Sequence, residues 1–273
     1  DGEYLDKVMG KWRNIDFKTI NYLKNKLQTK CKISVMIDIW RYDFDKLFES
    51  NKTGIDMIRL CVYPKDIIKY KEIYKNLYDK GYIISLNIIA VSHLTYENVN
   101  DILTNINEIK ENIEIVYIAD SFGALNINST ENLIRRFKKF CDSNNLLLGF
   151  HNHNNGNIAL TNALIAMREG VDIIDGTYGG IGRGGGNLDL ETFILYNYFY
   201  NNYNLDITSF LDFLTDIHTH NNLKIKYLKN LLCGYMNCHP YNLRNINNNN
   251  INLNNVYNYI NSLSNEKKLD YKK

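Results

Sequence analysis

The hydrophobic positions along the chain alternate between short apolar runs and longer segments with helical periodicity. Short apolar runs bounded by polar residues or glycine are typical of buried strands. They lie at Ile33–Ile37, Asp56–Val62, Tyr82–Ile89, Ile113–Ile118, Leu146–Phe150 and Val171–Ile174. Apolar residues at helical spacing follow them at residues 16–28, 65–79, 95–109, 130–141 and 157–169, and from Leu188 onward. This alternation predicts an α/β fold with a parallel sheet.

The pattern changes after Asn201. Residues 207–233 have the periodicity of two amphipathic helices, residues 243–255 are rich in Asn and predict a link, and a last helix is expected over Asn255–Ser264. We therefore expect an α/β domain over residues 1–202 and a helical C-terminal extension over residues 203–273.

Composition narrows the class of protein. With 273 residues, 45% of them hydrophobic, the chain can bury a full core. The formal net charge of +2 gives no electrostatic reason to expect nucleic acid or a membrane surface as a partner. No apolar run approaches the roughly 20 residues of a membrane span. The odd number of cysteines, 5, is typical of reduced thiols and predicts a cytoplasmic location.

Two histidines directly follow a predicted strand. Alternate side chains of a strand point to the same side, so His151 and His153 can face one point in space, as metal ligands do. The alternative is a hydrogen-bonded histidine pair packed near the end of the sheet. His218 and His220 repeat the spacing in a predicted helix, where such positions diverge, so we expect a structural role for them.

A glycine-rich loop follows the last predicted strand. Residues 180–185 satisfy the fingerprint G-x-G-x-x-G of dinucleotide sites, although no convincing strand follows. The other interpretation is a loop whose backbone approaches an anionic ligand. Asn187 then either caps the next helix or turns its oxygen to a metal ion. Arg183 either binds a carboxylate or phosphate, or lies in solvent.

Four further polar residues are candidates for the site. Asp120 and Ser121, at the end of a strand, are candidates to orient substrate or water in catalysis, and Asp120 could equally cap the following loop. Arg59 and Asn87 lie within strands, where unpaired polar side chains are costly to bury. An internal polar network and direct substrate binding are both open for them.

Four signatures resemble one family of metal-dependent aldolases and lyases. They are the His-Asn-His-Asn-Asn of residues 151–155, the segments EGVDIIDGT and GIGRGGGNLDLE, and the IADSFG that ends the fourth strand. The family includes 4-hydroxy-2-oxovalerate aldolase, hydroxymethylglutaryl-CoA lyase and isopropylmalate synthase. The resemblance implies a (β/α)8 TIM barrel. Because only six strands are predicted, we expect the first two strands, with a metal-binding Asp and its neighbouring Arg, upstream of Asp1.

The resemblance also implies a reaction. Divalent Mn²⁺ or Mg²⁺ would be bound by His151 and His153. Asn187 is a further candidate ligand, because the corresponding loop Asn binds the metal in some members of the family. A 4-hydroxy-2-oxoacid substrate would be cleaved to pyruvate and an aldehyde. The candidate partners are further copies of this chain, in a homo-oligomer, and a dehydrogenase. The alternatives are an acyl-CoA condensing enzyme or lyase on the same scaffold and a non-catalytic barrel homologue. With its first two strands upstream, the chain would be a fragment, and such a fragment could be inactive on its own.

Overall fold

The computed structural model describes residues 16–27, 31–244, 246 and 251–269. By its contacts the chain divides into two compact units, residues 1–175 and residues 176–273. The predicted loop over residues 1–14 and part of the Asn-rich link lie outside the described residues. The boundary predicted between residues 202 and 203 rests on the change of pattern after Asn201 and stays a prediction.

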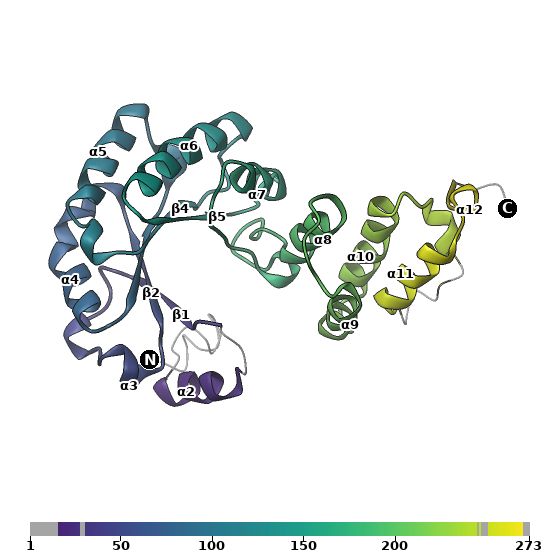
Figure 1. Ribbon diagram of the computed structural model, residues 1–273, viewed down its shortest axis with the longest axis horizontal. Helices are drawn as coiled ribbons and strands as arrows, with labels where there is room; N and C mark the ends of the chain where they lie inside the picture. Colours follow the sequence, from purple (N-terminus) through teal and green to yellow (C-terminus); the bar gives the residue numbers. More distant parts are fainter. Residues whose placement is uncertain (1–15, 28–30, 245, 247–250, 270–273) are drawn as a thin grey trace. The chain divides into compact units, whose positions relative to one another are not determined.

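The first unit is built on a parallel sheet of six strands in the order β1 to β6 (Figure 1). The strands are β1 (Ser34–Asp38), β2 (Met57–Val62), β3 (Ile83–Ile88), β4 (Ile115–Asp120), β5 (Leu147–Asn152) and β6 (Ile173–Ile174). The helices are α2 (Phe17–Lys26), α3 (Ser50–Thr53), α4 (Lys71–Asp79), α5 (Tyr96–Asn107), α6 (Ile127–Ser143) and α7 (Ala159–Arg168). The predicted α/β class and parallel sheet are confirmed. In the described residues β1 and β6 form the two edges, so a closed barrel stays a prediction.

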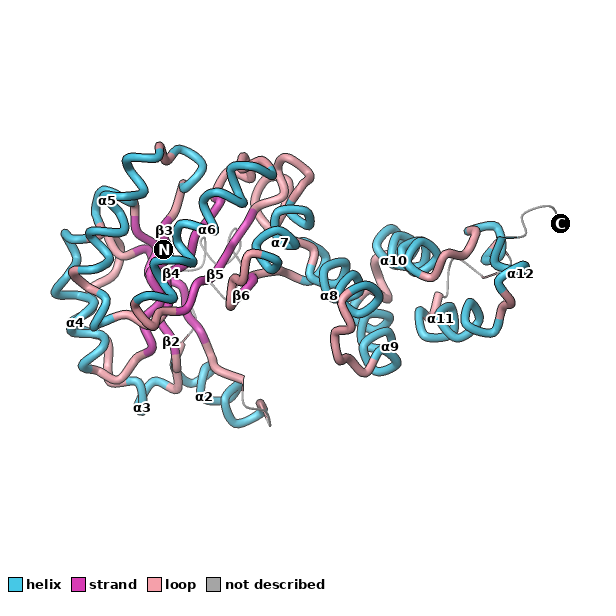
Figure 2. The backbone as a smooth tube through the Cα atoms, turned by 45° about the horizontal axis from the view of Figure 1, so that its top comes forward, coloured by secondary structure: helices cyan, strands magenta, loops and turns pink. Residues whose placement is uncertain are grey.

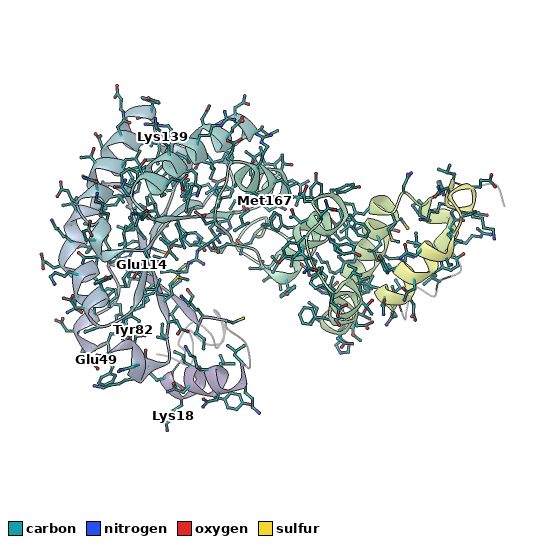
Figure 3. The ribbon with its side chains drawn as sticks, in the orientation of Figure 1. Lys18, Glu49, Tyr82, Glu114, Lys139 and Met167 are labelled. Carbon is teal, nitrogen blue, oxygen red and sulfur yellow. The ribbon has the colours of Figure 1, made fainter. Side chains whose placement is uncertain are left out.

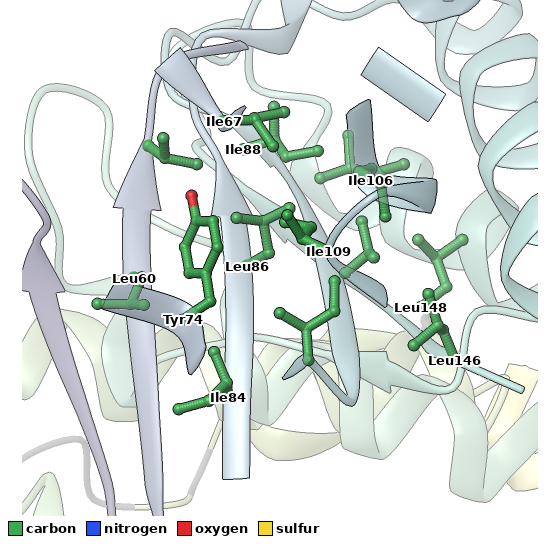
Figure 4. Packing of buried hydrophobic residues seen from close by; sticks show 14 of the residues in the cluster. Leu60, Ile67, Tyr74, Ile84, Leu86, Ile88, Ile106, Ile109, Leu146 and Leu148 are labelled. Atoms are coloured by element: carbon green, nitrogen blue, oxygen red, sulfur yellow. The ribbon is translucent and has the colours of Figure 1, made fainter. Parts of the chain in front are cut away.

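One face of this sheet carries the hydrophobic core. Side chains that alternate along β2 to β5 pack against the helices on the outer side of the sheet (Figures 1 and 4). The strand residues on this face are Ile58, Leu60, Val62, Ile84, Leu86, Ile88, Val116, Ile118, Leu148 and Phe150. Each buried side chain of this size contributes roughly 1.5–3 kcal/mol by leaving water. The opposite face of the same strands is therefore free to carry polar side chains.

Capping side chains set where the helices begin. The side chains of Thr95 and Asn126 each accept a hydrogen bond from the backbone N–H of the third residue of α5 and α6. The side chain of that third residue accepts one from the backbone N–H of the cap, which is the capping-box arrangement. The helix predicted over residues 65–79 begins later than expected. Pro64 starts a short 3-10 turn, a second turn follows, and α4 begins only at Lys71. Charged residues on these helices, such as Lys139 on α6, face solvent (Figure 3).

The second unit is helical. It contains the turn η7 (Tyr178–Gly180), α8 (Leu190–Tyr200), α9 (Ile207–Ile217), α10 (Asn222–Tyr235), η8 (Pro240–Leu243), α11 (Leu253–Ser262) and α12 (Asn265–Leu269). Figure 2 labels the helices α8 to α12. Its core is formed by side chains of the four helices α8 to α11 and includes Leu195, Leu211, Leu228 and Ile260. None of the described helices combines the length and the apolar character that a membrane crossing requires.

Candidate active site

A polar cluster on the face of the sheet away from the helices surrounds one carboxylate. Asp175, directly after β6, accepts hydrogen bonds from both terminal nitrogens of Arg59 on β2, at 3.1 and 2.5 Å. It also accepts one from the hydroxyl of Tyr117 on β4, at 3.1 Å. Nδ1 of His151, near the end of β5, lies 3.0 Å from the same carboxylate. Residues from three strands therefore converge on Asp175.

The electrostatics of the cluster favour an ionised Asp175. Burial alone would raise the pKa of this carboxyl, but the hydrogen bonds from His151 and Arg59, with the positive charge of Arg59, outweigh burial and hold the pKa below its usual value. Burial and the negative charge of Asp175 raise the pKa of Tyr117, so its hydroxyl stays protonated and donates. The guanidinium of Arg59 lies 4.0 Å from the centre of the Tyr117 ring, a cation–π contact.

A glycine makes room for the Tyr117 ring. In the register of the sheet Tyr117 lies beside Gly149 of β5. A Cβ atom at residue 149 would come within 2.5 Å of two ring atoms of Tyr117. The ring therefore occupies the space of the missing side chain, and only glycine fits beside it.

His153 lies next to His151 at the end of β5. The centres of the two imidazole rings are 5.2 Å apart, and the ring planes cross at 81°. The backbone of His153 is packed against Gly123, where a Cβ atom would lie 2.7 Å from the carbonyl oxygen of His153. Gly123 also has φ +58°, a conformation that favours glycine. The signature IADSFG thus ends on the residue that lets two loops meet beside the histidines.

The two imidazoles fit a metal ion as an incomplete ligand set. Because the ionised carboxylate of Asp175 can only accept, Nδ1 of His151 donates to it, and in the neutral ring Nε2 on the far edge keeps its lone pair. The side chain of His151 is 21% exposed, so the ring is partly open to solvent. Among the described residues, no group of three or more His, Cys, Asp and Glu side chains is arranged to bind a metal ion.

Arg59 and Asn87 belong to internal polar contacts. Both terminal nitrogens of Arg59 bind Asp175, and its buried Nε has no hydrogen-bond partner in the described part of the chain. Asn87 is 1% exposed and accepts a hydrogen bond from Ser85 at 2.9 Å. Of the two roles left open by the sequence, the geometry shows the network, and substrate binding by either residue stays a prediction.

Asp120 and Ser121 serve the loops that follow β4 and β3. The carboxylate of Asp120 is fully buried and accepts hydrogen bonds from the backbone N–H groups of Ala124 and Leu125, at 3.1 and 3.0 Å. The hydroxyl of Ser121 accepts one from the backbone N–H of Ala90 at 3.0 Å. Asp120 therefore caps its loop, which was one of its two expected roles, and a catalytic role for either residue stays a prediction.

The remaining two candidates lie in the glycine loop of the second unit. Nδ2 of Asn187 donates to the carbonyl oxygen of Ile181 at 3.0 Å, while its buried Oδ1 has no partner among the described residues. Asn187 does not cap α8, because Asp189 occupies that position and accepts from Thr192. Arg183 is exposed. An acceptor oxygen without a partner suits a cation, so a metal-binding role for Asn187 stays a prediction.

A second buried carboxylate holds this loop in place. Glu191, the last residue of the GIGRGGGNLDLE segment, is fully buried and accepts the backbone N–H of Gly179 with both oxygens, at 2.8 and 2.9 Å. Nε2 of His218 lies 2.5 Å from the same carboxylate. Burial, together with the nearby carboxyl of Asp189, raises the pKa of Glu191. The structural role expected for His218 is thus visible.

Sequence reasoning did not single out Asp175 and Tyr117 as site residues. Asp175 stood in the EGVDIIDGT segment and directly follows a strand, the position at which parallel sheets present their functional side chains. Its position after a strand could therefore have identified Asp175 as a site residue. Tyr117 carries no such signal, because its place in the site depends on the glycine across the sheet.

The fold and the site together define the class of protein. Parallel strands alternate with helices, and the paired imidazoles lie at the carboxyl end of a strand, where barrel enzymes carry their active sites. The chain belongs to the HMGL-like family, which matches residues 48–217, more than half of its length. The family resemblance seen in the sequence is confirmed.

Individual relatives agree with this assignment. The chain is 30% identical over 142 residues to an oxaloacetate decarboxylase of Mycobacterium tuberculosis, with 51% of this chain and 40% of the relative covered. It is 27% identical over 167 residues to a 4-hydroxy-2-oxovalerate aldolase of Geobacillus thermodenitrificans, with 60% and 47% covered. The chain thus spans less than half of the length of these curated relatives.

Solved structures share the fold. The N-terminal domain of a proposed aldolase from Bacteroides vulgatus has a TM-score of 0.63 at 23% identity, covering 90% of this chain and 78% of that one. The HMG-CoA lyase of Bacillus subtilis has a TM-score of 0.54 at 16% identity, covering 66% and 67%. At these identities the similarity shows the fold alone.

Proposed function

We propose that this chain carries the metal-binding and substrate-facing part of a carbon–carbon lyase that releases pyruvate from a 2-oxoacid. The observation that supports it most is the imidazole pair of His151 and His153 at the carboxyl end of β5, with His151 held by Asp175, in a chain of the HMGL-like family. The relatives named as a 4-hydroxy-2-oxovalerate aldolase and an oxaloacetate decarboxylase support the choice of substrate class.

The chain's own residues bind and orient in this proposal. Nε2 of His151 and the ring of His153 bind a divalent ion, Mn²⁺ or Mg²⁺. Asn187, in the second unit, stays a predicted metal ligand through its oxygen, which has no partner among the described residues. Such an ion supplies Lewis-acid chemistry, which withdraws electron density from the 2-oxo group of a substrate. Imidazole alone is a weak ligand set for these hard ions, so further oxygen ligands are needed.

The leading reaction is aldol cleavage. A base takes the proton of the 4-hydroxyl group, the bond between C3 and C4 breaks to give an aldehyde, and C3 is then protonated to give pyruvate. The described residues do not identify this base. The second candidate is decarboxylation of oxaloacetate, which the Mycobacterium tuberculosis relative supports. It breaks the corresponding bond and releases carbon dioxide in place of the aldehyde, with no hydroxyl proton to remove.

The test is a pyruvate-release assay with and without Mn²⁺, on this chain and on the full-length gene product, using a short 4-hydroxy-2-oxoacid and oxaloacetate in parallel. Metal-dependent release that is lost in His151→Ala and His153→Ala is expected, while the control His220→Ala, an exposed histidine of the second unit, keeps it. The preferred substrate decides between the two reactions. Release that is independent of metal, or unaffected by both histidine variants, would refute the proposal.

A further inference from the structure

We propose that Asp175 is a positioning residue of this site: it fixes the tautomer of His151 and, by binding Arg59, keeps that guanidinium away from substrate. The inference rests on the proposed function for its catalytic meaning. The side-chain arrangement on which the inference rests can be tested without measuring catalysis.

The first step is the number of donors that meet one carboxylate. Oδ1 of Asp175 accepts from Arg59 and Tyr117, each at 3.1 Å. Oδ2 accepts from the other terminal nitrogen of Arg59 and lies 3.0 Å from Nδ1 of His151. A carboxylate paired with a guanidinium through both oxygens has no hydrogen to offer. The hydrogen between Asp175 and His151 must therefore be on Nδ1.

The second step is that the backbone places Asp175 beside His151. The backbone N–H of Asp175 donates to the carbonyl oxygen of Phe150 at 3.0 Å, one residue before the histidine. Phe150 itself pairs with Ile174 in the sheet. The contact between Asp175 and His151 is thus set by strand pairing between β5 and β6, and it does not depend on a flexible side chain reaching across a gap.

The third step concerns Arg59. Its two terminal nitrogens are both occupied by Asp175, and the face of its guanidinium lies on the ring of Tyr117. Its side chain is 13% exposed. A substrate carboxylate that took this edge of the guanidinium would displace Asp175 and leave a buried carboxylate without its counter-charge, which is unfavourable. We therefore assign Arg59 to holding Asp175, in place of substrate binding, the other role that the sequence left open.

The experiment compares Asp175→Asn with Asp172→Asn. Asp172 is a matched control, because it lies three residues earlier at the other end of β6, accepts from the backbone N–H of Leu148 at 2.8 Å and pairs with Lys138. The readouts are the ring nitrogen shifts of His151, measured by NMR above the usual histidine pKa of about 6.5 and assigned by their loss in His151→Ala, and the Kd for Mn²⁺ alone.

The wild type is expected to show His151 with hydrogen on Nδ1. In Asp175→Asn the amide can donate to that nitrogen, so the hydrogen moves to Nε2 and the Kd for Mn²⁺ rises by about 10–100-fold. Asp175→Glu, which keeps an acceptor-only carboxylate, should retain the Nδ1–H form. Asp172→Asn should change neither readout.

Two results would overturn the inference. One is a wild-type His151 with its hydrogen on Nε2, a measurement that needs no folded Asp175 variant. The other is a folded Asp175→Asn protein with the wild-type tautomer and unchanged Mn²⁺ affinity. If the tautomer and Mn²⁺ binding respond as expected while no 2-oxoacid yields pyruvate, the positioning role stands and the proposed lyase function fails.

Discussion

Replacing Gly149 by alanine tests the packing that holds the site together. The added Cβ atom would lie 2.5–2.6 Å from three atoms of the Tyr117 ring, whereas carbon atoms in ordinary contact are about 3.5–4.0 Å apart. The ring must therefore move by about 1 Å. Tyr117 is 1% exposed and is held by Arg59 and Asp175, so it has little freedom to do so.

The cost follows from overpacking. Forcing extra volume into a well-packed region costs about 1–3 kcal/mol. Replacing glycine by alanine also restricts the unfolded chain, which offsets about 0.4–1 kcal/mol. We expect the free energy of unfolding to fall by about 1–2 kcal/mol, which for a unit of this size lowers Tm by roughly 2–4 °C per kcal/mol.

The assay is urea denaturation followed by tryptophan fluorescence. Both tryptophans of the chain, Trp12 and Trp40, belong to residues 1–175, so the signal reports on the first unit. Gly234→Ala is the control, because a Cβ atom there would meet nothing within 4 Å and the residue lies in α10 of the second unit. It should leave the fluorescence transition unchanged.

Combining Gly149→Ala with substitutions of Tyr117 distinguishes the steric clash from a general effect of alanine. In Tyr117→Leu the ring atoms nearest to Gly149 are gone, so Gly149→Ala should cost much less there. In Tyr117→Phe the ring remains, so the full cost should persist. An unchanged unfolding free energy in Gly149→Ala, or an equal loss in the Tyr117→Leu background, would refute the reasoning.

Two further predictions concern carboxylates of the first unit. Asp120→Ala leaves two backbone N–H groups without an acceptor, so the free energy of unfolding should fall by about 2 kcal/mol or more, and Asp120→Asn, which keeps one acceptor, should recover part of it in the same urea assay; equal losses would contradict this. Burial raises the pKa of Asp56, but hydrogen bonds from Lys24 and the backbone N–H of Ile33 outweigh it and keep the pKa below its usual value. Its contribution to stability is therefore present above about pH 4 and lost as the pH falls further, so the stability difference between wild type and Asp56→Asn should shrink in acid, and a difference that is constant with pH would count against it.

The six strands were predictable because a parallel sheet covered by helices needs short, strongly apolar runs. Each observed strand lies within two residues of the predicted one, as for β2 at Met57–Val62. The helix predicted from residue 65 failed at its start, because Pro64 favours a tight turn while the periodicity of the following apolar residues extends backward through it. Hydrophobic periodicity therefore predicted the positions of the helices and strands better than the residues at which they begin and end.

The candidate site was predictable where it depends on neighbours in the sequence. His151 and His153 emerged from their spacing alone, and the structure places their rings together. The contacts of Asp175 with Arg59 and Tyr117 join residues 116 and 58 positions apart in the chain. Such contacts depend on strand order and register, which composition and local spacing do not contain.

Register also explains why two acidic residues at strand ends have different roles. In the pairing of β4 with β5, His151 lies beside Ala119, while Asp120 lies beside Asn152. Side chains alternate between the faces of a sheet, so Asp120 shares the helix-covered face with Asn152, whose amide donates to the carbonyl oxygen of Ala159 at the start of α7. Asp175 contacts His151 on the opposite face. Because a shift of one residue would exchange the faces, it is parity in the sheet, and not the type of residue or its place after a strand, that puts Asp175 in the site and Asp120 in a loop cap.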